Sequence, residues 1–286
     1  KMSQTISQIS NQTGFAHLTD LPCLKLVCGQ ASAVISLYGA QLLSYQPVPG
    51  RELLWLSPKA VWQQQQAIRG GVPVCWPWFG PAGKPFNISA AKLPNHGLVR
   101  NRLWRQVQAE PSTQQALVTL SIDVDDIPAL HHSVTLNLTL KLTAEALTLQ
   151  LDCAEPMLQQ AALHSYFAVP SLSDTSISPL PGAYLDKTLG GERVQSTAPV
   201  RFEREIDRVY PEPAAELLLQ SGAQQLNISQ QGQDATVVWN PWRERSQAIF
   251  DLEADGYQQF VCVETARLDL TSAAPLQLCQ RLTSLT

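Results

Sequence analysis

The sequence has few charged residues and no long apolar run. Only 15% of its 286 residues are Asp, Glu, Lys or Arg, against a usual share of about 25%, while 44% are hydrophobic. This composition excludes an intrinsically disordered chain, which needs high charge and little apolar content. No stretch approaches the roughly 20 apolar residues of a membrane-spanning helix, and a net charge of −4 gives no general attraction for nucleic acid. We therefore expect neither membrane nor nucleic acid as a partner.

Several catalytic and metal-binding signatures are also missing. The sequence contains no Cys-x-x-Cys pair, Walker A loop, Gly-x-Gly-x-x-Gly, His-Glu-x-x-His or Gly-x-Ser-x-Gly pattern. Its six cysteines are predicted to be free and mostly buried thiols, because a chain of this length can build a core without disulfides. Residues 1–8 are polar and lack the apolar segment of a secretion signal. Together these features predict a cytoplasmic protein without a metal site.

What the sequence has in abundance is alternation of apolar and polar residues with a period of two. The segments Thr135–Thr143 and Leu147–Cys153 alternate without a break, and the short turn between them predicts a β-hairpin. Val118–Val124 shows the same pattern. Five further strands are predicted at Leu24–Val27, Ala33–Leu37, Gln225–Ser229, Ala235–Trp239 and Phe260–Thr265.

Helices are predicted at only two short segments, Lys59–Ile68 and Ala214–Gln220. No repeat or flexible linker divides the chain, so residues 1–286 are predicted to form one domain, with about residues 1–20 either flexible or at an edge. The predicted fold is all-β, a large antiparallel β-sandwich whose long loops carry the chemistry.

The segment Ile68–Pro81 combines a Gly-Gly pair with clustered aromatic residues. Paired glycines let the backbone approach a ligand closely. The ring of Trp78 offers a flat apolar face that suits the C–H face of a sugar, although aromatic rings in such a loop can equally pack in the core. Trp76–Pro77 and Val72–Pro73 are candidates for cis peptide bonds.

Two arginines are candidates for binding an anion. Arg69 precedes the glycine pair, and Arg100 follows His96 and Gly97 within a second loop. A guanidinium group matches the geometry of a phosphate, so the two could converge on one. The alternative is that both arginines are solvated at the surface.

His164 and Glu264 each lie in a strongly apolar segment. Glu264 ends a strand that is apolar on both faces, and a carboxylate buried there needs a partner or a catalytic role because burying an unpaired charge is costly. The structural alternative for Glu264 is an ion pair with an arginine such as Arg267. The structural alternative for His164 is a histidine that is simply hydrogen-bonded in the core. Asp207, in a small charged cluster, is a candidate acceptor for sugar hydroxyls or a solvated residue.

As an ordered set, these segments resemble a known family. The set comprises Arg69–Gly80, His96–Arg100, Leu163–Phe167, Asp207–Tyr210, Trp239–Trp242 and Cys262–Glu264. It resembles the hexose-6-phosphate mutarotases, also called glucose-6-phosphate 1-epimerases, of the aldose 1-epimerase superfamily. The resemblance extends from about Leu24 to the end of the sequence.

The resemblance implies a β-sandwich of the galactose-mutarotase-like type. It also implies interconversion of the α and β anomers of hexose 6-phosphates, glucose 6-phosphate first among them, with no metal or organic cofactor. Glu264 would be the general base and His164 the general acid, and we place them on opposite sides of the sugar ring. A small-molecule substrate is the expected partner, and the protein is expected to be a monomer.

The same resemblance assigns the binding residues. His96 and Asp207 would hold sugar hydroxyls, and Arg69 and Arg100 would hold the phosphate. Three alternatives remain at this point: a mutarotase for free aldoses, a non-catalytic phosphosugar-binding module of the same fold, and a glycosidase or lyase. A glycosidase would need two carboxylates, for which Glu264 and Asp207 are the candidates.

Overall fold

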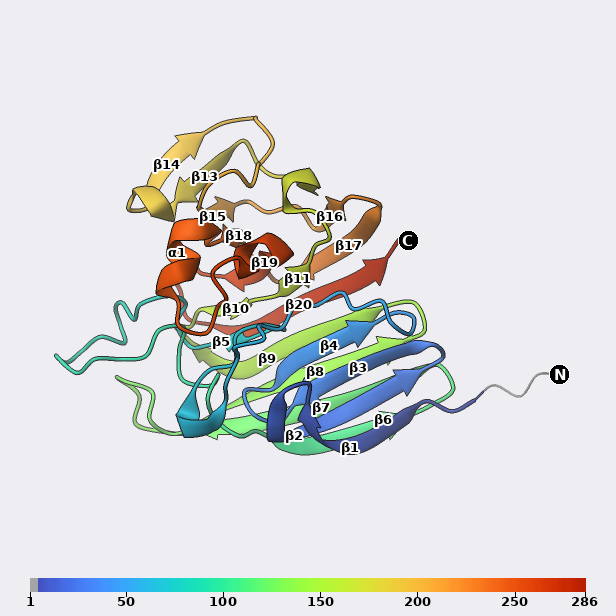
Figure 1. The fold of residues 1–286 in the computed structure, drawn as a ribbon. Helices are drawn as coiled ribbons and strands as arrows, with labels where there is room; N and C mark the ends of the chain where they lie inside the picture. The colour runs from blue at the N-terminus through green and yellow to red at the C-terminus, as the bar shows by residue number, and fades with distance from the viewer. Residues whose placement is uncertain (1–4) are drawn as a thin grey trace.

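The computed structural model describes residues 5–286 and consists mainly of antiparallel β-strands (Figure 1). The predicted all-β fold is confirmed. A four-stranded sheet has the order β1 (Gln8–Phe15), β2 (Leu18–Cys28), β3 (Ala31–Ser36) and β4 (Gln41–Gln46). β1 lies at the edge of this sheet, while residues 1–4 of the N-terminal segment lie outside the described residues.

An eight-stranded sheet, called here the long sheet, forms one layer of the sandwich. Its strands follow the order β12 (Thr175–Ser178), β16 (Glu216–Ser221), β17 (Gln224–Gln231), β20 (Ala274–Ser284), β9 (Leu147–Met157), β8 (Val134–Thr143), β7 (Gln115–Val124) and β6 (Arg105–Pro111).

A second eight-stranded sheet, called here the site sheet, carries the candidate functional residues. Its strands follow the order β14 (Glu192–Gln195), β13 (Ala183–Asp186), β15 (Ile206–Pro211), β18 (Ala235–Asn240), β19 (Phe260–Arg267), β10 (Ala161–Leu163) and β5 (Val74–Cys75), and β11 (Tyr166–Ala168) also pairs with β19. The single α-helix among residues 5–286 is α1 (Trp242–Ala248), and four short 3₁₀ segments are η1 (Gln63–Gln65), η2 (Leu172–Asp174), η3 (Lys187–Leu189) and η4 (Gly256–Gln259).

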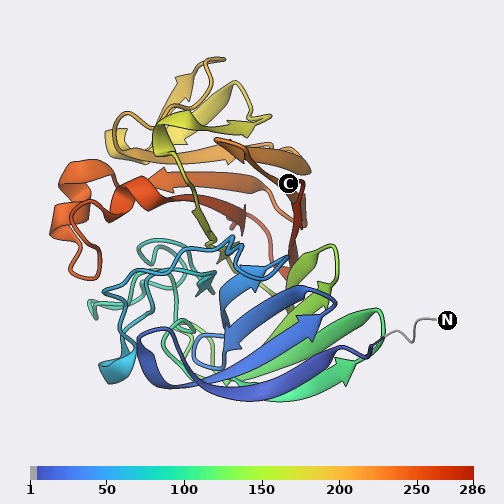
Figure 2. The same cartoon turned by 45° about the vertical axis from the view of Figure 1, so that its right-hand side comes forward.

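The four-stranded sheet and the site sheet together cover one face of the long sheet. β2 and β3 pack against β8, and β19 packs against β20, as the two views of the ribbon show (Figures 1 and 2). Leu138 and Leu278 face this interior from neighbouring parts of the long sheet, and Val263 faces it from the site sheet. The alternation of β8 follows from this arrangement, since every second side chain enters the core.

The predicted strands and the hairpin are confirmed. Each predicted segment lies in a strand or overlaps one, and Leu142 pairs with Leu147 at the hairpin between β8 and β9. The cysteines are all free, and five of the six are buried. Trp76–Pro77 is cis as predicted, whereas Val72–Pro73 is not among the cis bonds of residues 5–286.

Both predicted helices are wrong. Ala214–Gln220 overlaps β16, where Leu217 and Leu219 are buried and Leu218 is partly exposed, so the leucine run has a period of two. Lys59–Ile68 is a loop that contains only η1, because Gln64 and Gln65 have positive φ angles of 60° and 59°. None of the helices in residues 5–286 is long and apolar enough to cross a membrane.

One turn of the long sheet yields a stability prediction. Gly232 follows β17 with φ +76°, and a Cβ there would lie 1.8 Å from the backbone oxygen of Gln277. We expect Gly232→Ala to lower the free energy of unfolding by about 3–4 kcal/mol. The alanine would adopt a strained φ, and the backbone at Gln277 would also have to move.

Gly50→Ala is the matched control for this prediction. Gly50 has φ +83° but no atom within 4 Å of the position of a Cβ, so only the conformational cost of about 1–2 kcal/mol applies. Urea unfolding measures both variants, and equal losses would contradict the steric argument.

Candidate active site

The strand register brings His164 and Glu264 together. Leu163 pairs with Thr265 and Tyr166 pairs with Cys262, so the two intervening residues His164 and Glu264 stand opposite each other. Side chains at opposed positions of an antiparallel pair share one face of the sheet. His164 Nε2 lies 2.8 Å from Glu264 Oε1, and the Glu264 side chain is only 1% exposed. Both side chains therefore project from the same face of the site sheet.

A second row of side chains lies beside this pair on the same face. Asp207 pairs with Trp239, which pairs with Cys262, which pairs with Tyr166, across β15, β18, β19 and β11. Asp207, Trp239 and Tyr166 line a cavity of about 710 Å³ together with His164 and Glu264. The Tyr166 ring stacks on His164 with 5.2 Å between centroids. Two rows of one sheet face thus form the floor of the cavity.

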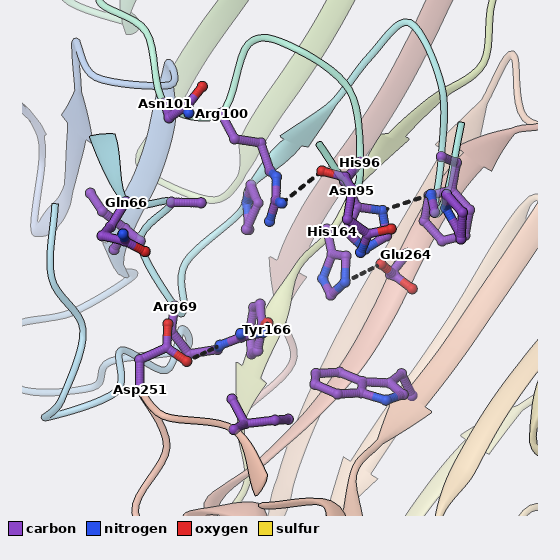
Figure 3. Close-up of a pocket in the computed structure, with 18 of the residues that line it drawn as sticks. Gln66, Arg69, Asn95, His96, Arg100, Asn101, His164, Tyr166, Asp251 and Glu264 are labelled. Carbon is purple, nitrogen blue, oxygen red and sulfur yellow. Dashed lines mark hydrogen bonds and ion pairs between the residues drawn. The ribbon is translucent and has the colours of Figure 1, made fainter. Parts of the chain in front are cut away.

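Arg69 and Arg100 both line the cavity but have different partners (Figure 3). Arg69 donates from Nε to Asp251 Oδ1 at 3.0 Å and from Nη1 to the Tyr166 hydroxyl at 3.1 Å. Arg100 donates to the backbone oxygen of Asn95 at 2.9 Å and has no carboxylate partner among residues 5–286. The charge of Arg69 is therefore partly neutralised within the protein, and that of Arg100 is not.

The Gly-Gly pair has a structural role rather than the predicted approach to a ligand. A Cβ on Gly70 would lie 2.5 Å from the backbone oxygen of Trp55, and one on Gly71 would lie 2.1 Å from that of Leu42. The two glycines allow this loop to pack tightly on neighbouring backbone, which fixes the chain directly after Arg69.

His96 is held as a neutral hydrogen-bond donor. The ring Nδ1 of His96 accepts a hydrogen bond from the backbone N–H of Gly80 at 2.9 Å, and the backbone N–H of His96 donates to the backbone oxygen of Gly80. Burial, followed by the neighbouring His164 and the charge of Arg100, holds the pKa of His96 well below its ordinary value. With Nδ1 occupied as an acceptor, the proton of the neutral ring resides on Nε2.

Asp207 lies in an environment that favours its protonated form. Burial raises the pKa of Asp207 to about 6, while the nearby Lys187 and Glu264 act in opposite directions. At neutral pH the side chain is mainly a carboxylate, which accepts hydrogen bonds as the sequence predicted for a contact with sugar hydroxyls.

The expectation for Trp78 is wrong, and the alternative partner considered for Glu264 does not contact it. Trp78 is 0% exposed, donates to the oxygen of Pro94 and does not line the cavity. Partly or fully exposed aromatic side chains there include Phe79, Trp239 and Phe250. Arg267 is bonded to the oxygen of Pro275 outside the cavity, so the partner of Glu264 is His164 and not this arginine.

Several lining residues were not predicted. Lys187 lies over the Phe79 ring at 5.3 Å from its centroid. Arg245 of α1 and Asp251 of the loop after α1 also reach the cavity. The sequence places Tyr166 on the same strand face as His164, two residues away, although it assigns Tyr166 no role in the site. No group of three or more metal-binding side chains occurs within residues 5–286.

Comparison with known sequences identifies the family. The sequence profile described as aldose 1-epimerase matches residues 22–274. The chain belongs to the aldose 1-epimerase family. A Salmonella typhimurium relative named "putative glucose-6-phosphate 1-epimerase" is 30% identical over 96% of this chain and 94% of its own length. An Escherichia coli relative of the same name is 32% identical over 91% of this chain and 88% of its own length.

Solved structures of related proteins share the fold of this aldose 1-epimerase family member. A Salmonella typhimurium protein described as a "putative mutarotase" superposes with a TM-score of 0.85 at 29% identity, covering 96% of both chains. The galactose 1-epimerase of Lactobacillus acidophilus superposes with a TM-score of 0.72 at 14% identity, covering 97% of this chain and 98% of its own. The predicted galactose-mutarotase-like sandwich is thereby confirmed.

The shifted Asp207 predicts how stability depends on pH. Its pKa is about 6 in the folded protein and about 4 in an unfolded chain, so the folded state binds the extra proton between these values. This group therefore destabilises the fold progressively as pH rises from about 4 to about 6, and fully above pH 6. Relative to the parent protein, Asp207→Asn should become more stable across that window and then keep a constant difference. Urea unfolding at pH 4 to 7 measures this, and a difference that is constant throughout would contradict the shift.

Proposed function

We propose that this aldose 1-epimerase family member interconverts the α and β anomers of hexose 6-phosphates, with glucose 6-phosphate as the first candidate substrate. The observation that carries the proposal is the contact of 2.8 Å between His164 and Glu264 on the floor of a cavity that also presents arginines. The names of the relatives at about 30% identity support the choice of substrate.

The proposed reaction needs one base and one acid close to a single carbon. The C1 hydroxyl loses its proton to Glu264 while the ring oxygen O5 receives a proton from His164, and the C1–O5 bond breaks to give the aldehyde. Both oxygens are bonded to C1, so an acid and a base in mutual contact are suitably spaced to serve them. Positioned acid–base groups of this kind each contribute roughly 10²–10⁴-fold to a rate.

Ring closure restores both groups. After rotation about the C1–C2 bond, O5 attacks the other face of the carbonyl, His164 takes back the O5 proton and Glu264 returns its proton to O1. The other anomer results, with no net change in the protonation of the enzyme. Neutral His96 cannot compete as the acid at neutral pH, because its pKa lies well below the ordinary value.

The remaining groups of the cavity would bind and orient the sugar. His96 donates from Nε2 to one hydroxyl, Asp207 accepts from another, and the Trp239 ring offers an apolar face on the same floor. Arg100, without a carboxylate partner, would carry most of the attraction for the phosphate, and Arg69 and Lys187 add positive charge elsewhere in the lining of the same cavity. A phosphate bound far from C1 orients the ring and adds binding energy.

The side chains that line the cavity also distinguish the proposed function from two alternative functions. A mutarotase of free aldoses would use His164 and Glu264 in the same way but would not need Arg100. A glycosidase would need two carboxylates across a glycosidic bond, whereas the group in contact with Glu264 is the imidazole of His164. That contact favours proton transfer at a hemiacetal over hydrolysis.

The acid–base roles predict a large loss of turnover. His164→Ala and Glu264→Gln should each lower kcat for glucose 6-phosphate by about 100-fold or more, with the fold retained. Saturation transfer between the two anomeric proton resonances measures the exchange. Near-normal transfer in either folded variant would contradict its assigned role.

The phosphate assignment predicts a substrate-dependent change in KM. Arg100→Ala should raise KM for glucose 6-phosphate by about tenfold or more, the effect of losing a hydrogen bond to a charged group, and should change KM for glucose much less. Arg102→Ala is the matched control, because Arg102 is two residues away and pairs with Asp126 outside the cavity. An equal change for both sugars would argue against a phosphate contact.

A further inference from the structure

A polar network lies buried between the site sheet and the long sheet, directly behind the catalytic pair. Gln230 and Gln280 stand opposite each other on β17 and β20, and their exposures are 2% and 1%. They face Ser165, Thr236 and Thr265 of the site sheet, all of which are fully buried. The surrounding interior is apolar.

Gln280 makes the central bonds of this network. Its Oε1 accepts from the Ser165 hydroxyl at 2.6 Å, and its Nε2 donates to the Thr265 hydroxyl at 2.9 Å and to the backbone oxygen of Val263 at 3.3 Å. The Thr265 hydroxyl in turn donates to Gln230 Oε1 at 2.7 Å. Buried amide groups are costly unless they are paired, and here both ends of the Gln280 amide are bonded.

The partners of Gln280 are the sequence neighbours of the two catalytic residues. Ser165 follows His164, and Val263 and Thr265 flank Glu264 on either side. Because successive side chains of a strand point to opposite faces, each catalytic side chain enters the cavity while its neighbours point back toward Gln280. One side chain of the long sheet thus ties together the backbone segments that carry the acid and the base.

The regular pairing with β19 is interrupted at this point of the site sheet. β10 ends at Leu163 and β11 begins at Tyr166, so His164 and Ser165 fall between two strands. The N–H of His164 bonds away from β19, to the oxygen of Pro73, and the bond from Val263 N to Ser165 O is 3.2 Å long. The bond from Ser165 to Gln280 adds a short tether where the strand is interrupted.

We propose that Gln280 is a positioning residue for catalysis, which sets the separation of His164 and Glu264 from behind the sheet. The inference rests on the proposed function. Gln280 does not line the cavity, so it would act on a bound sugar only through His164 and Glu264. Its loss changes the turnover step, since a small displacement of a reacting group lowers the rate strongly, and it leaves the binding groups Arg100 and His96 in place.

The first test replaces the amide by an apolar side chain of similar size. Gln280→Met should lower kcat for the α–β exchange by about tenfold to 100-fold, with KM for glucose 6-phosphate nearly unchanged. Gln159→Met is the matched control: Gln159 is also a buried and fully bonded glutamine, 1% exposed, but its partners are Trp76, Glu155 and Ala274. Both variants should lose stability, and only Gln280→Met should lose turnover.

A second variant keeps the test valid if Gln280→Met fails to fold. Ser165→Ala removes the same hydrogen bond from the other partner and deletes a single oxygen atom. It should also lower kcat at constant KM. The double variant should be no slower than Gln280→Met alone, because Gln280→Met already removes the bond to Ser165.

A spectroscopic measurement separates this inference from the proposed function. In protein labelled at its histidines, the His164 ring resonances, assigned with His164→Ala, should shift in Gln280→Met and remain as in the parent protein in Gln159→Met. This holds even if no sugar phosphate is turned over. Unchanged His164 resonances and kcat in Gln280→Met and Ser165→Ala would overturn the proposal, as would equal losses of kcat in Gln280→Met and Gln159→Met.

Discussion

The register of β10 and β11 against β19 determines how the central pair of the candidate site is assembled. With Leu163 paired to Thr265 and Tyr166 paired to Cys262, His164 and Glu264 are forced to meet on one face. Continuing the same register through β18 and β15 places Trp239 and Asp207 beside them. A shift of β19 by one residue would move Glu264 to the other face of the sheet, away from His164. The rest of the fold, including the long sheet behind these strands, holds that register.

Burial then tunes the chemistry of the groups so assembled. The same exclusion of water raises the pKa of Asp207 toward neutrality and lowers that of His96, since in each case the charged form is disfavoured. One residue becomes an acceptor that titrates near pH 6, and the other becomes a permanent donor. Two side chains that touch the same cavity thus acquire complementary hydrogen-bonding roles from a single physical cause.

The sequence predicted the long buried strands and the central residues of the site, but not the parts that depend on tertiary contacts. Strands such as β8 reveal themselves by alternation, whereas β6 is exposed along its whole length and β5 has only two residues, so neither carries a pattern. His164 and Glu264 could be singled out because a polar side chain in an apolar strand needs either a hydrogen-bonding partner or a function. Asp251, which neutralises Arg69 from 182 positions away, and Trp78, buried instead of facing a ligand, could be placed only by the fold.

The division of labour along β19 also limits how such a protein can diverge. Its residues alternate between the cavity and the shared core, as with Glu264 and Val263, so an insertion or deletion of one residue in the strand would exchange cavity-facing and core-facing positions. The loop between Gly80 and Asn95 contributes to the cavity mainly at its ends and has no such alternation. We therefore expect changes of length to be tolerated in loops of this kind, which could reshape the mouth of the cavity while His164 and Glu264 keep their positions.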